Sequence, residues 1–447
     1  MEDEVREAGG ARALMIDPAA VRAHFPALDA ARRSSPAPRR RPNGEGEPRR
    51  IPIFFDNPAG TQIAAEALSR MNDYLVNRNA NHDGVFRASR ESDAMVLEAR
   101  GAMADFLGAA RPEEISFGQN MTSLTLHVSR SIARLLQPGD EVVVTRLDHD
   151  ANIAPWLLAA RDRDCVVRWV DFDTADCTWN AAHLEQAITK RTRIVAVGYA
   201  SNATGTINPV ADAVKLAHAA GALCFVDAVH YAPHGRIDVS ALGCDLLVCS
   251  AYKFFGPHTG VLWGAADLME RLEAYKVRPS SDAPPGKWET GTQSFESIAG
   301  VLGAVEYLAW VGQAFGSVTT GSRKDALRAA MEVIRGYELG LSRQLLDGLR
   351  SIKGLEIHGI TDPARLEQRV ATYSFTMKGL HPRAICEKLD AAGISAWDGN
   401  YYAPEVTTRL GLEKTGGMVR IGAVHYTTAE EVRTLIGSLS AIARSGT

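Results

Sequence analysis

Cysteine is scarce in this sequence. Six cysteines occur in 447 residues, and no two of them form a CxxC pair. Cys224, Cys249 and Cys386 stand in apolar stretches that are typical of strands or helices. Scattered cysteines in such contexts are usually reduced and buried. We therefore expect free thiols rather than a disulfide framework, and a cytoplasmic protein.

A membrane span, a secretory signal and a basic surface are also missing from the pattern. We find no uninterrupted apolar run of the ~18 residues that a span requires. The first ten residues, MEDEVREAGG, are acidic and lack an apolar core, which is unlike a signal peptide. The net charge of -4 gives no electrostatic footprint for nucleic acid. We therefore predict neither a membrane nor a nucleic acid as a partner.

What is present is an ordinary globular composition, 46% hydrophobic and 23% charged, in a chain long enough for two domains. Residues 34–50, SSPAPRRRPNGEGEPRR, are rich in Pro, Gly and charge. This predicts a flexible loop within an N-terminal segment, residues 1–50. We expect a large domain over 51–315 and a smaller α+β domain over 316–447.

Short apolar runs alternate with amphipathic helical stretches in the expected large domain. The runs lie at 115–118, 141–147, 166–172, 193–200, 223–229, 245–251 and 260–265. Runs of Val, Ile and Leu without alternation are buried on both faces, which predicts a mostly parallel seven-stranded sheet covered by helices. Strand–helix alternation indicates the α/β class. A long helix is expected over 323–351.

One lysine stands in an unusual place. The stretch CSAYKFFGPHTG, residues 249–260, puts Lys253 between aromatic residues directly after the apolar run DLLV. Desolvating an ammonium group is costly, and ligands of open α/β sheets gather at the carboxyl ends of the strands. Polar or helix-starting residues follow the other runs: Met121, Thr122, His149, Asn202, Asp227 and His230. Five strand ends thus carry groups suited to one ligand.

The chemistry of this set fits pyridoxal 5'-phosphate. Lys253 can form a Schiff base with the aldehyde, and Asp227 can keep the pyridine nitrogen protonated so that the ring acts as an electron sink. His149 can stack on the ring. A helix N-terminus with Thr122, together with Ser250, can bind the phosphate. Burial would also lower the pKa of the lysine and make it a usable base.

The motifs DHDANIAPW, SNATGTINP, VDAVHYAPHG, SAYKFFGPHTG and WETGTQ follow one another in this order. With them, from FFDNPAGT to HYTTAEEV, the chain resembles fold-type I pyridoxal-phosphate enzymes of the class V aminotransferase family. The resemblance is to the branch of cysteine desulfurases and selenocysteine lyases. It implies a large cofactor-binding domain, a smaller C-terminal domain and pyridoxal phosphate as cofactor.

The resemblance also implies roles for individual residues. Lys253 would carry the internal aldimine, Asp227 would pair with the ring nitrogen and His149 would stack on the ring. The remaining cofactor contacts would come from Met121, Thr122, Asn202, His230, Ser250 and Tyr252. Thr292 in WETGTQ would reach the phosphate of a neighbouring subunit, which implies a homodimer. Arg420 in GGMVRIGAVHY would bind the substrate α-carboxylate, a task that suits a bidentate guanidinium.

The loop SAWDGNYYAPEV departs from the desulfurase pattern. Tyr402 stands where desulfurases carry the cysteine that takes up sulfur as a persulfide, and Trp397 replaces an arginine common in that loop. The nearest cysteine, Cys386, lies in the helical pattern AICEKLDAAG. We expect cleavage of a C–S bond by β-elimination from cysteine or an S-substituted cysteine, through an external aldimine and a quinonoid, with Tyr402 beside the substrate and without a persulfide on the loop.

Other functions remain open at this point. An aminotransferase or epimerase of the same family would use the same residues. Ser250 to Lys253 also matches S-x-x-K, and Lys414 begins a K-T-G, as in acyl-serine enzymes. However, S-x-x-K should open a helix, whereas here it closes a strand. A non-catalytic protein would not require both Lys253 and Asp227. We predict no metal site, because His82 and Asp83, like His149 and Asp150, are adjacent rather than spaced as ligands.

Overall fold

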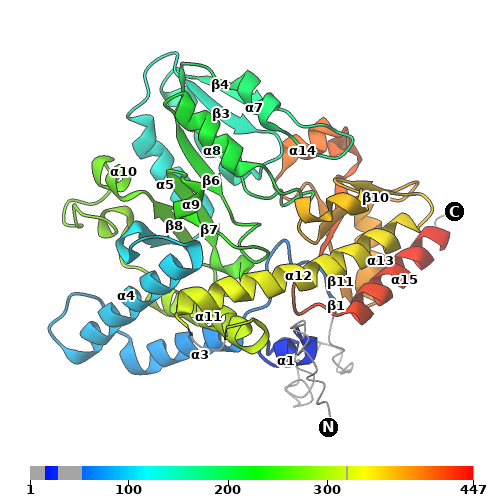
Figure 1. The fold of residues 1–447 in the computed structure, drawn as a ribbon, viewed down its shortest axis with the longest axis horizontal. Coiled ribbons are helices and arrows are strands. Elements are labelled where there is room, and N and C mark those ends of the chain that lie inside the picture. Colours follow the sequence, from blue (N-terminus) through cyan, green and yellow to red (C-terminus); the bar gives the residue numbers. More distant parts are fainter. Residues whose placement is uncertain (1–15, 29–52, 319–320, 446–447) are drawn as a thin grey trace, which may run out of the picture.

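The computed structural model describes residues 16–28, 53–318 and 321–445, and Figure 1 shows its ribbon. The predicted loop at 34–50 lies outside these ranges. The helices are α1 (Pro18–Arg22), α3 (Ala65–Asp73), α4 (Arg87–Leu107), α5 (Met121–Ala133), α6 (Ala154–Asp162), α7 (Ala181–Ala187), α8 (Val210–Ala219), α9 (Val239–Leu242), α10 (Ala266–Arg271), α11 (Phe295–Phe315), α12 (Arg323–Arg350), α13 (Pro382–Ala391), α14 (Pro404–Arg409) and α15 (Ala429–Ser445).

The strands fall into three sheets. The seven-stranded sheet holds β2 (Ile115–Gly118), β3 (Glu141–Thr145), β4 (Val166–Val170), β5 (Thr192–Gly198), β6 (Leu223–Asp227), β7 (Leu246–Ser250) and β8 (Gly260–Gly264). The other two hold β9 (Leu355–His358), β10 (Thr372–Met377), β12 (Trp397–Gly399) and β13 (Met418–Gly422), and the pair β1 (Ile53–Phe54) with β11 (Ile394–Ser395).

The seven-stranded sheet has the order β2-β8-β7-β6-β5-β3-β4. Only β8 runs antiparallel to its neighbours β2 and β7, and the other pairings are parallel. The predicted mostly parallel sheet is therefore confirmed, and each predicted run overlaps one of its strands. Edge strand β4 differs from the prediction in one respect: its residues alternate, and Val166 is 44% exposed. An edge strand lacks a neighbour on one side and its end is less covered.

Helices cover both faces of this sheet. Successive strand residues point to opposite faces, so alternate apolar residues of one strand pack against different helices. Val142 and Val144 of β3 pack in one core cluster with α5, α6 and α10. Val143 of the same strand belongs to the other cluster, which includes α4, α8 and α11. The carboxyl ends of the parallel strands therefore lie at one edge of a sheet that is covered on both faces.

The second core belongs to the four-stranded antiparallel sheet β12-β13-β10-β9, which packs with α12, α13 and α15. Strand β1 adds to this part of the molecule, because Ile53 pairs with Ile394 of β11 and Phe55 is buried in the same core. Residues 53–55 therefore pack with the C-terminal part of the chain. The domain boundaries at residues 50 and 315 stay predictions.

Helix α11 is strongly apolar, but it leaves the expectation of no uninterrupted apolar run unchanged. It is the one helix among the described residues that is long and apolar enough to cross a membrane by length and composition, with a mean hydropathy of 1.4 over its best window. In the sequence, Glu296 and Glu306 interrupt the apolar residues of this helix. Of that window, 72% is buried inside the protein, and Glu306 pairs with Arg70. An apolar helix packed on all sides is a core helix.

Residues near the two chain ends are joined. Arg22 of α1 donates to Glu431 of α15 at 2.9 Å and to the carbonyl of Tyr426 at 3.1 Å. Phe25 is fully buried, with its ring centroid 4.7 Å from that of Tyr426 and 5.1 Å from that of Tyr307 in α11. This clasp, residues 16–28 against α11 and α15, closes the side of the molecule next to the small sheet.

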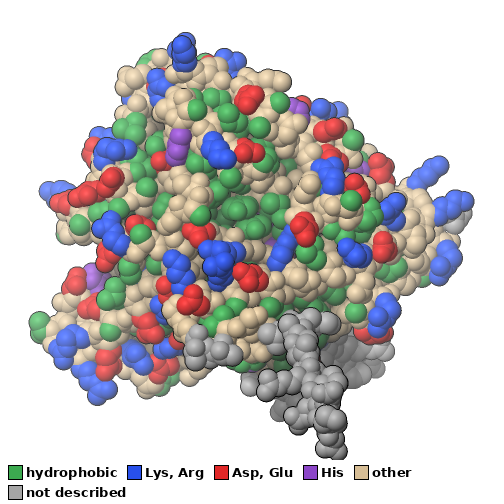
Figure 2. Space-filling model, in the orientation of Figure 1, with side chains coloured by type: hydrophobic (Ala, Val, Ile, Leu, Met, Phe, Trp, Pro, Cys, Tyr) green, Lys and Arg blue, Asp and Glu red, His purple; other side chains and the backbone are tan. Residues whose placement is uncertain are grey.

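The surface carries charges of both signs. On the face in Figure 2, Lys and Arg side chains are interspersed with Asp and Glu rather than gathered into a patch of one sign. All six cysteines are free, and five of them are buried, as the sequence predicts.

Candidate active site

Lys253 lies in the 3-10 helix η4 (Ala251–Lys253), immediately after β7. Its side chain is buried, and Nζ donates to the carbonyl oxygens of Pro58 and, at 2.8 Å, Ala59. Burial lowers the pKa of the amine to about 7, and the Arg420 guanidinium lowers it further, while Asp56 and Asp227 act in the opposite direction. Carbonyls hold the amine without a carboxylate bonded to it, so about half of it is unprotonated near neutrality.

Two buried carboxylates lie near this lysine. Asp227 ends β6, accepts the Val229 N–H at 2.9 Å, and has its pKa raised to about 6 by burial. Asp148 follows β3 and accepts from Thr145 Oγ1 at 2.7 Å and from Asn152 Nδ2 at 2.8 Å. Burial raises the pKa of Asp148 to about 7, and the charge of Asp227 contributes to that shift.

Sequence reasoning missed Asp148, which lines the same cavity as Lys253 and Asp227. Space for its carboxylate depends on Gly198 at the end of β5, where a Cβ would come within 2.8 Å of Asp148 Oδ1. A signal was available: the carboxylate precedes His149 directly after a strand, at the ligand edge of the sheet.

His149 is held as a neutral ring. Its Nδ1 accepts the Ala151 N–H at 3.0 Å, which leaves the proton on Nε2. Burial lowers its pKa to about 4, and the positive charges of Lys253 and Arg420 add to this effect. One face of the ring stacks on Tyr402, with the centroids 5.7 Å apart and the planes 19° from parallel.

The N-terminus of α5 faces the cavity through Met121 and Thr122 and is suited to an anion. Asn120 caps this helix by accepting the Ser123 N–H at 2.9 Å. The Met121 N–H donates to Ser250 Oγ at 3.0 Å, which ties the helix to the end of β7. The Thr122 hydroxyl faces the cavity and contacts the Met121 sulfur at 3.6 Å. Helix N-termini attract phosphate through free N–H groups and the helix dipole.

Arg420 of β13 is a second group suited to an anion. It is 3% exposed, and Nη1 donates to the carbonyl of Asn202 at 3.0 Å. Nη2 lies 3.7 Å from Asp56 Oδ1, an ion pair without a hydrogen bond, and Nε has no hydrogen-bond partner among the described residues. The guanidinium also lies 4.3 Å from the ring centroid of Tyr401. A buried cation whose Nε has no partner in the described part of the chain, and whose Nη2 makes only an ion pair at 3.7 Å, is suited to an anionic ligand.

The other predicted residues complete the inner wall. Asn202 Nδ2 donates to the Tyr401 carbonyl at 2.9 Å, but among the described residues nothing donates to its buried Oδ1. His230 Nε2 is 3.1 Å from Thr372 Oγ1, and burial holds the pKa of His230 well below its ordinary value. Tyr252 stacks on His258 beside Lys253, with centroids 5.0 Å apart.

Two of the residues singled out in the sequence lie elsewhere. Thr292 lines a separate cavity of about 570 Å³ with residues such as Asn120 and His258. Cys386 is buried in α13, where burial raises the pKa of its thiol to about 12. No cysteine is among the described residues that line the cavity around Lys253 or its outer extension.

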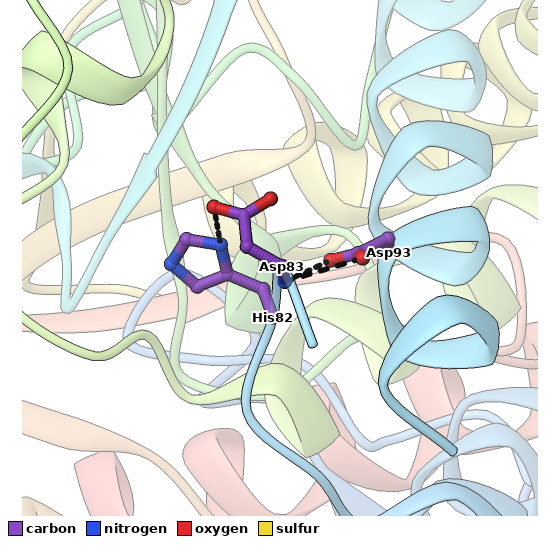
Figure 3. Close-up of side chains that lie close together, drawn as sticks. All are labelled: His82, Asp83 and Asp93. Atoms are coloured by element: carbon purple, nitrogen blue, oxygen red, sulfur yellow. Dashed lines mark hydrogen bonds and ion pairs between the residues drawn. The ribbon is translucent and has the colours of Figure 1, made fainter. Parts of the chain in front are cut away.

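A small cluster of His82, Asp83 and Asp93 lies apart from this cavity, with His82 and Asp83 on the loop before α4 and Asp93 within α4. The ligand atoms of the three residues lie within 4.8 Å of one another, and Figure 3 shows the side chains close together. His82 Nδ1 contacts Asp83 Oδ2 at 2.8 Å, and the Asp83 N–H points to both oxygens of Asp93 at 3.3 Å. These internal contacts account for the cluster, which is exposed at His82 and Asp83. The expectation of no metal site stays a prediction.

The cavity fits pyridoxal phosphate by its chemistry. It combines a buried amine, a buried carboxylate, a flat neutral imidazole and a helix N-terminus that faces it. The unpartnered Asn202 Oδ1 and Arg420 Nε indicate a polar ligand. The individual roles of the lining residues stay predictions, but the fold and the site define a pyridoxal-phosphate enzyme of fold type I.

Comparison with known proteins assigns the family. The model of the class V aminotransferases matches residues 53–435. A probable cysteine desulfurase of Streptomyces coelicolor is 31% identical over 87% of this chain and 91% of its own. An aminotransferase-like protein, FGM3, of Gibberella zeae is also 31% identical, over 87% of this chain and 94% of its own. A solved cysteine desulfurase of Thermococcus onnurineus superposes with a TM-score of 0.82 at 25% identity, over 97% of this chain and 100% of that one. The chain belongs to the class V aminotransferase family.

Proposed function

We propose that the protein is a lyase that breaks the C–S bond of cysteine or of an S-substituted cysteine. The observation that carries the proposal is the pairing of a buried amine, Lys253, with a buried and partly unpaired guanidinium, Arg420, beside one cavity. The names of the relatives support a sulfur-containing amino acid as substrate.

When bound, pyridoxal phosphate supplies an electron sink for the negative charge that develops at the substrate Cα. Asp227 is suited to keep a proton on the pyridine nitrogen, because it is buried and accepts only one backbone N–H bond. Thr122 and the N-terminus of α5 are suited to the phosphate. His149, which is neutral, offers a flat ring face.

Arg420 and Lys253 act on the substrate in this proposal. The Nε–Nη2 edge of Arg420 binds the α-carboxylate, while Nη1 remains on the Asn202 carbonyl. Lys253, with a pKa of about 7, takes the proton from Cα. The Cβ–S bond then breaks with its electron pair on sulfur. The sulfur leaves as sulfide or a thiol, and water converts the carbon skeleton to pyruvate and ammonia.

The fate of sulfur separates this proposal from a persulfide mechanism. The thiolate is the nucleophile in sulfur transfer, and Tyr402 offers only a phenol at the loop position. The Cys386 thiol is buried and protonated. We propose that sulfur leaves directly as sulfide or a thiol, without first forming a persulfide on the protein. Mass spectrometry after turnover on cysteine tests this, with Cys386→Ser as the comparison. A persulfide that is lost in this variant together with activity would contradict it.

A direct assay tests the reaction itself. The protein is incubated with cysteine, cysteine sulfinate and S-substituted cysteines, and pyruvate, alanine, sulfide and thiol are measured. We expect pyruvate with sulfide or thiol, a yellow protein, and loss of both the product and the borohydride-reducible lysine adduct in Lys253→Ala. Lys353→Ala, on the surface, is the matched control. Alanine as the main product would support a desulfurase instead.

An aminotransferase or an epimerase is the second candidate, and the aminotransferase-like relative supports the first of these. Amino-group transfer to a 2-oxo acid, or loss of optical rotation without pyruvate, would identify these reactions in the same assay.

We also propose a cytoplasmic homodimer, in which Thr292 serves the neighbouring subunit.

A further inference from the structure

The cavity at Lys253 continues outward into a wider chamber of about 490 Å³. Its inner end holds Arg420 and Lys253, and its outer wall is mostly apolar. That wall comes from α5, the start of α6, β12 and the loop before α14: Leu126, Ala154, Pro155, Trp397 and Tyr402. Its inner end is lined by Thr122, His149 and Lys253, so the cofactor would fill that end, and the outer part would remain for substrate groups larger than cysteine, which has seven heavy atoms.

Two aromatic residues form the mouth of the chamber. Tyr402 is 75% exposed and Trp397 is 53% exposed, so both are among the large hydrophobic side chains that the described residues present to solvent. Trp397 is the register partner of Arg420 across β12 and β13, which places it beside the group suited to an anion. Exposed apolar side chains that converge on one cavity indicate a binding surface.

The loop holds Tyr402 firmly in place. Tyr401 and Tyr402 both have φ of 58°, in the left-handed region that is costly for residues other than glycine. The Tyr402 carbonyl accepts the Asp150 N–H at 2.7 Å, and the Tyr401 carbonyl accepts Asn202 Nδ2 at 2.9 Å. The Tyr401 hydroxyl also donates to the Met418 carbonyl. Several partners therefore maintain a strained backbone that keeps the Tyr402 ring stacked on His149.

Asp150 makes the chamber unfavourable for an anionic substituent. Among the described residues that line it, Asp150 is the one carboxylate, and burial raises its pKa. An anionic substituent would be repelled by this group once it is ionised, whereas Arg420 is already engaged at the inner end. The wall is therefore suited to a neutral, apolar group.

We propose that Tyr402 and Trp397 select amino acids whose sulfur carries an apolar alkyl or aryl substituent, in preference to free cysteine or cysteine sulfinate. This inference rests on the proposed C–S lyase function. The α-carboxylate lies on Arg420, the Cβ–S bond near Lys253, and the substituent between the two aromatic rings.

The first test compares kcat/KM for cysteine, S-methylcysteine and S-benzylcysteine. We expect S-benzylcysteine to exceed cysteine by roughly tenfold or more, since contacts in an apolar pocket give discrimination of this size. Tyr402→Ala and Trp397→Ala should each remove most of the preference, chiefly through KM, and Tyr402→Phe should retain it. Tyr275→Ala, an exposed tyrosine outside the chamber, is the matched control.

The second test measures binding without C–S cleavage. Homophenylalanine has no sulfur to lose, and its inhibition constant is compared with that of 2-aminobutyrate. Tighter binding of homophenylalanine that depends on Tyr402 supports the aromatic mouth even if no thioether is cleaved, in which case only the reaction assignment fails. Cleavage with cysteine as the preferred substrate, or an aryl preference that survives both alanine variants, would overturn the inference and leave the lyase function intact.

Discussion

Lys253 is buried against two backbone carbonyls, and this environment makes a definite prediction for the cofactor-free protein. An ordinary lysine has a pKa near 10.4, whereas burial lowers that of Lys253 to about 7. The unprotonated, reactive fraction therefore rises as pH passes through 7 instead of 10. Competitive labelling of the apoprotein with an amine reagent, read by peptide mass spectrometry, should give half-maximal reactivity of Lys253 near pH 7.

Lys353 on the surface provides the comparison in the same samples. A Lys253 profile that coincides with that of Lys353 would show that the amine is solvated before the cofactor binds. Because the readout is labelling, it does not depend on turnover.

Asp227 supports a second prediction at the same scale. Asp227→Asn keeps the shape of the side chain but cannot hold a proton on a ring nitrogen as a carboxylate can. We expect the variant to retain cofactor and to lose at least about tenfold in kcat/KM, or about 1.4 kcal/mol in the barrier. Absorbance measures the retained cofactor, and Asp171→Asn, at a surface pair with Arg409, is the control. A smaller loss would remove Asp227 from this role.

The same residues show how much of the candidate site could be predicted from the sequence. Lys253, Asp227 and His149 were predictable because each follows an apolar run at the ligand edge of the sheet. Asp148 follows such a run as well, but its importance depends on complete burial. That burial results from the space above Gly198 and from hydrogen bonds with Thr145 and Asn152, and only the folded chain brings the glycine to it.

At the scale of elements, the effect of the α5 N-cap on stability can be separated from its effect on cofactor binding. Asn120→Ala removes the capping box, which should lower the free energy of unfolding by about 1 kcal/mol. Because the same turn faces the cavity, we also expect weaker retention of cofactor on dialysis. Asn180→Ala removes a capping box of the same kind from α7, outside both cavities at Lys253.

The two variants should therefore lose similar stability in thermal unfolding, while only Asn120→Ala loses cofactor. Equal retention by both variants would show that the first turn of α5 does not bind the phosphate.

Elements also differ in how predictable they were. The strands were found because seven apolar runs differ sharply from their surroundings. The conformation of the loop before α14 could not be predicted in this way, because two consecutive tyrosines with positive φ contradict the local backbone preference of non-glycine residues. Their partners, Asn202 and Asp150, lie about 200 residues away or more along the chain, so no local pattern could have indicated them.

At the scale of the whole molecule, Thr292 makes a prediction about assembly. It lies in a cavity apart from Lys253 of its own chain, and we expect it to serve a second copy. The chain has a mass of 48.2 kDa, so sedimentation should give twice that value, 96.4 kDa. An active species that sediments as a single chain would exclude this arrangement.

Hybrid dimers test the contribution of Thr292 itself. Lys253→Ala is expected to be inactive, and Thr292→Val to bind cofactor weakly. In a hybrid of the two, the intact Lys253 site receives Thr292 from the other chain. Mixing should therefore restore tight cofactor binding at one site per dimer, whereas a Thr292 that acts within its own chain would give no recovery.

The clasp of residues 16–28 has a consequence for the order in which the protein can form during synthesis. Arg22 and its partner Glu431 are 409 positions apart. At ribosomal rates of 5–20 residues per second, roughly 20–80 s pass between the synthesis of these two residues. Until then Phe25, which ends fully buried, has no Tyr426 to pack against. Phe255 and Tyr307, whose ring centroids lie 5.7 and 5.1 Å from that of Phe25, are made earlier, so it is the last part of this packing and the ion pair of Arg22 that can form only when the chain is nearly complete.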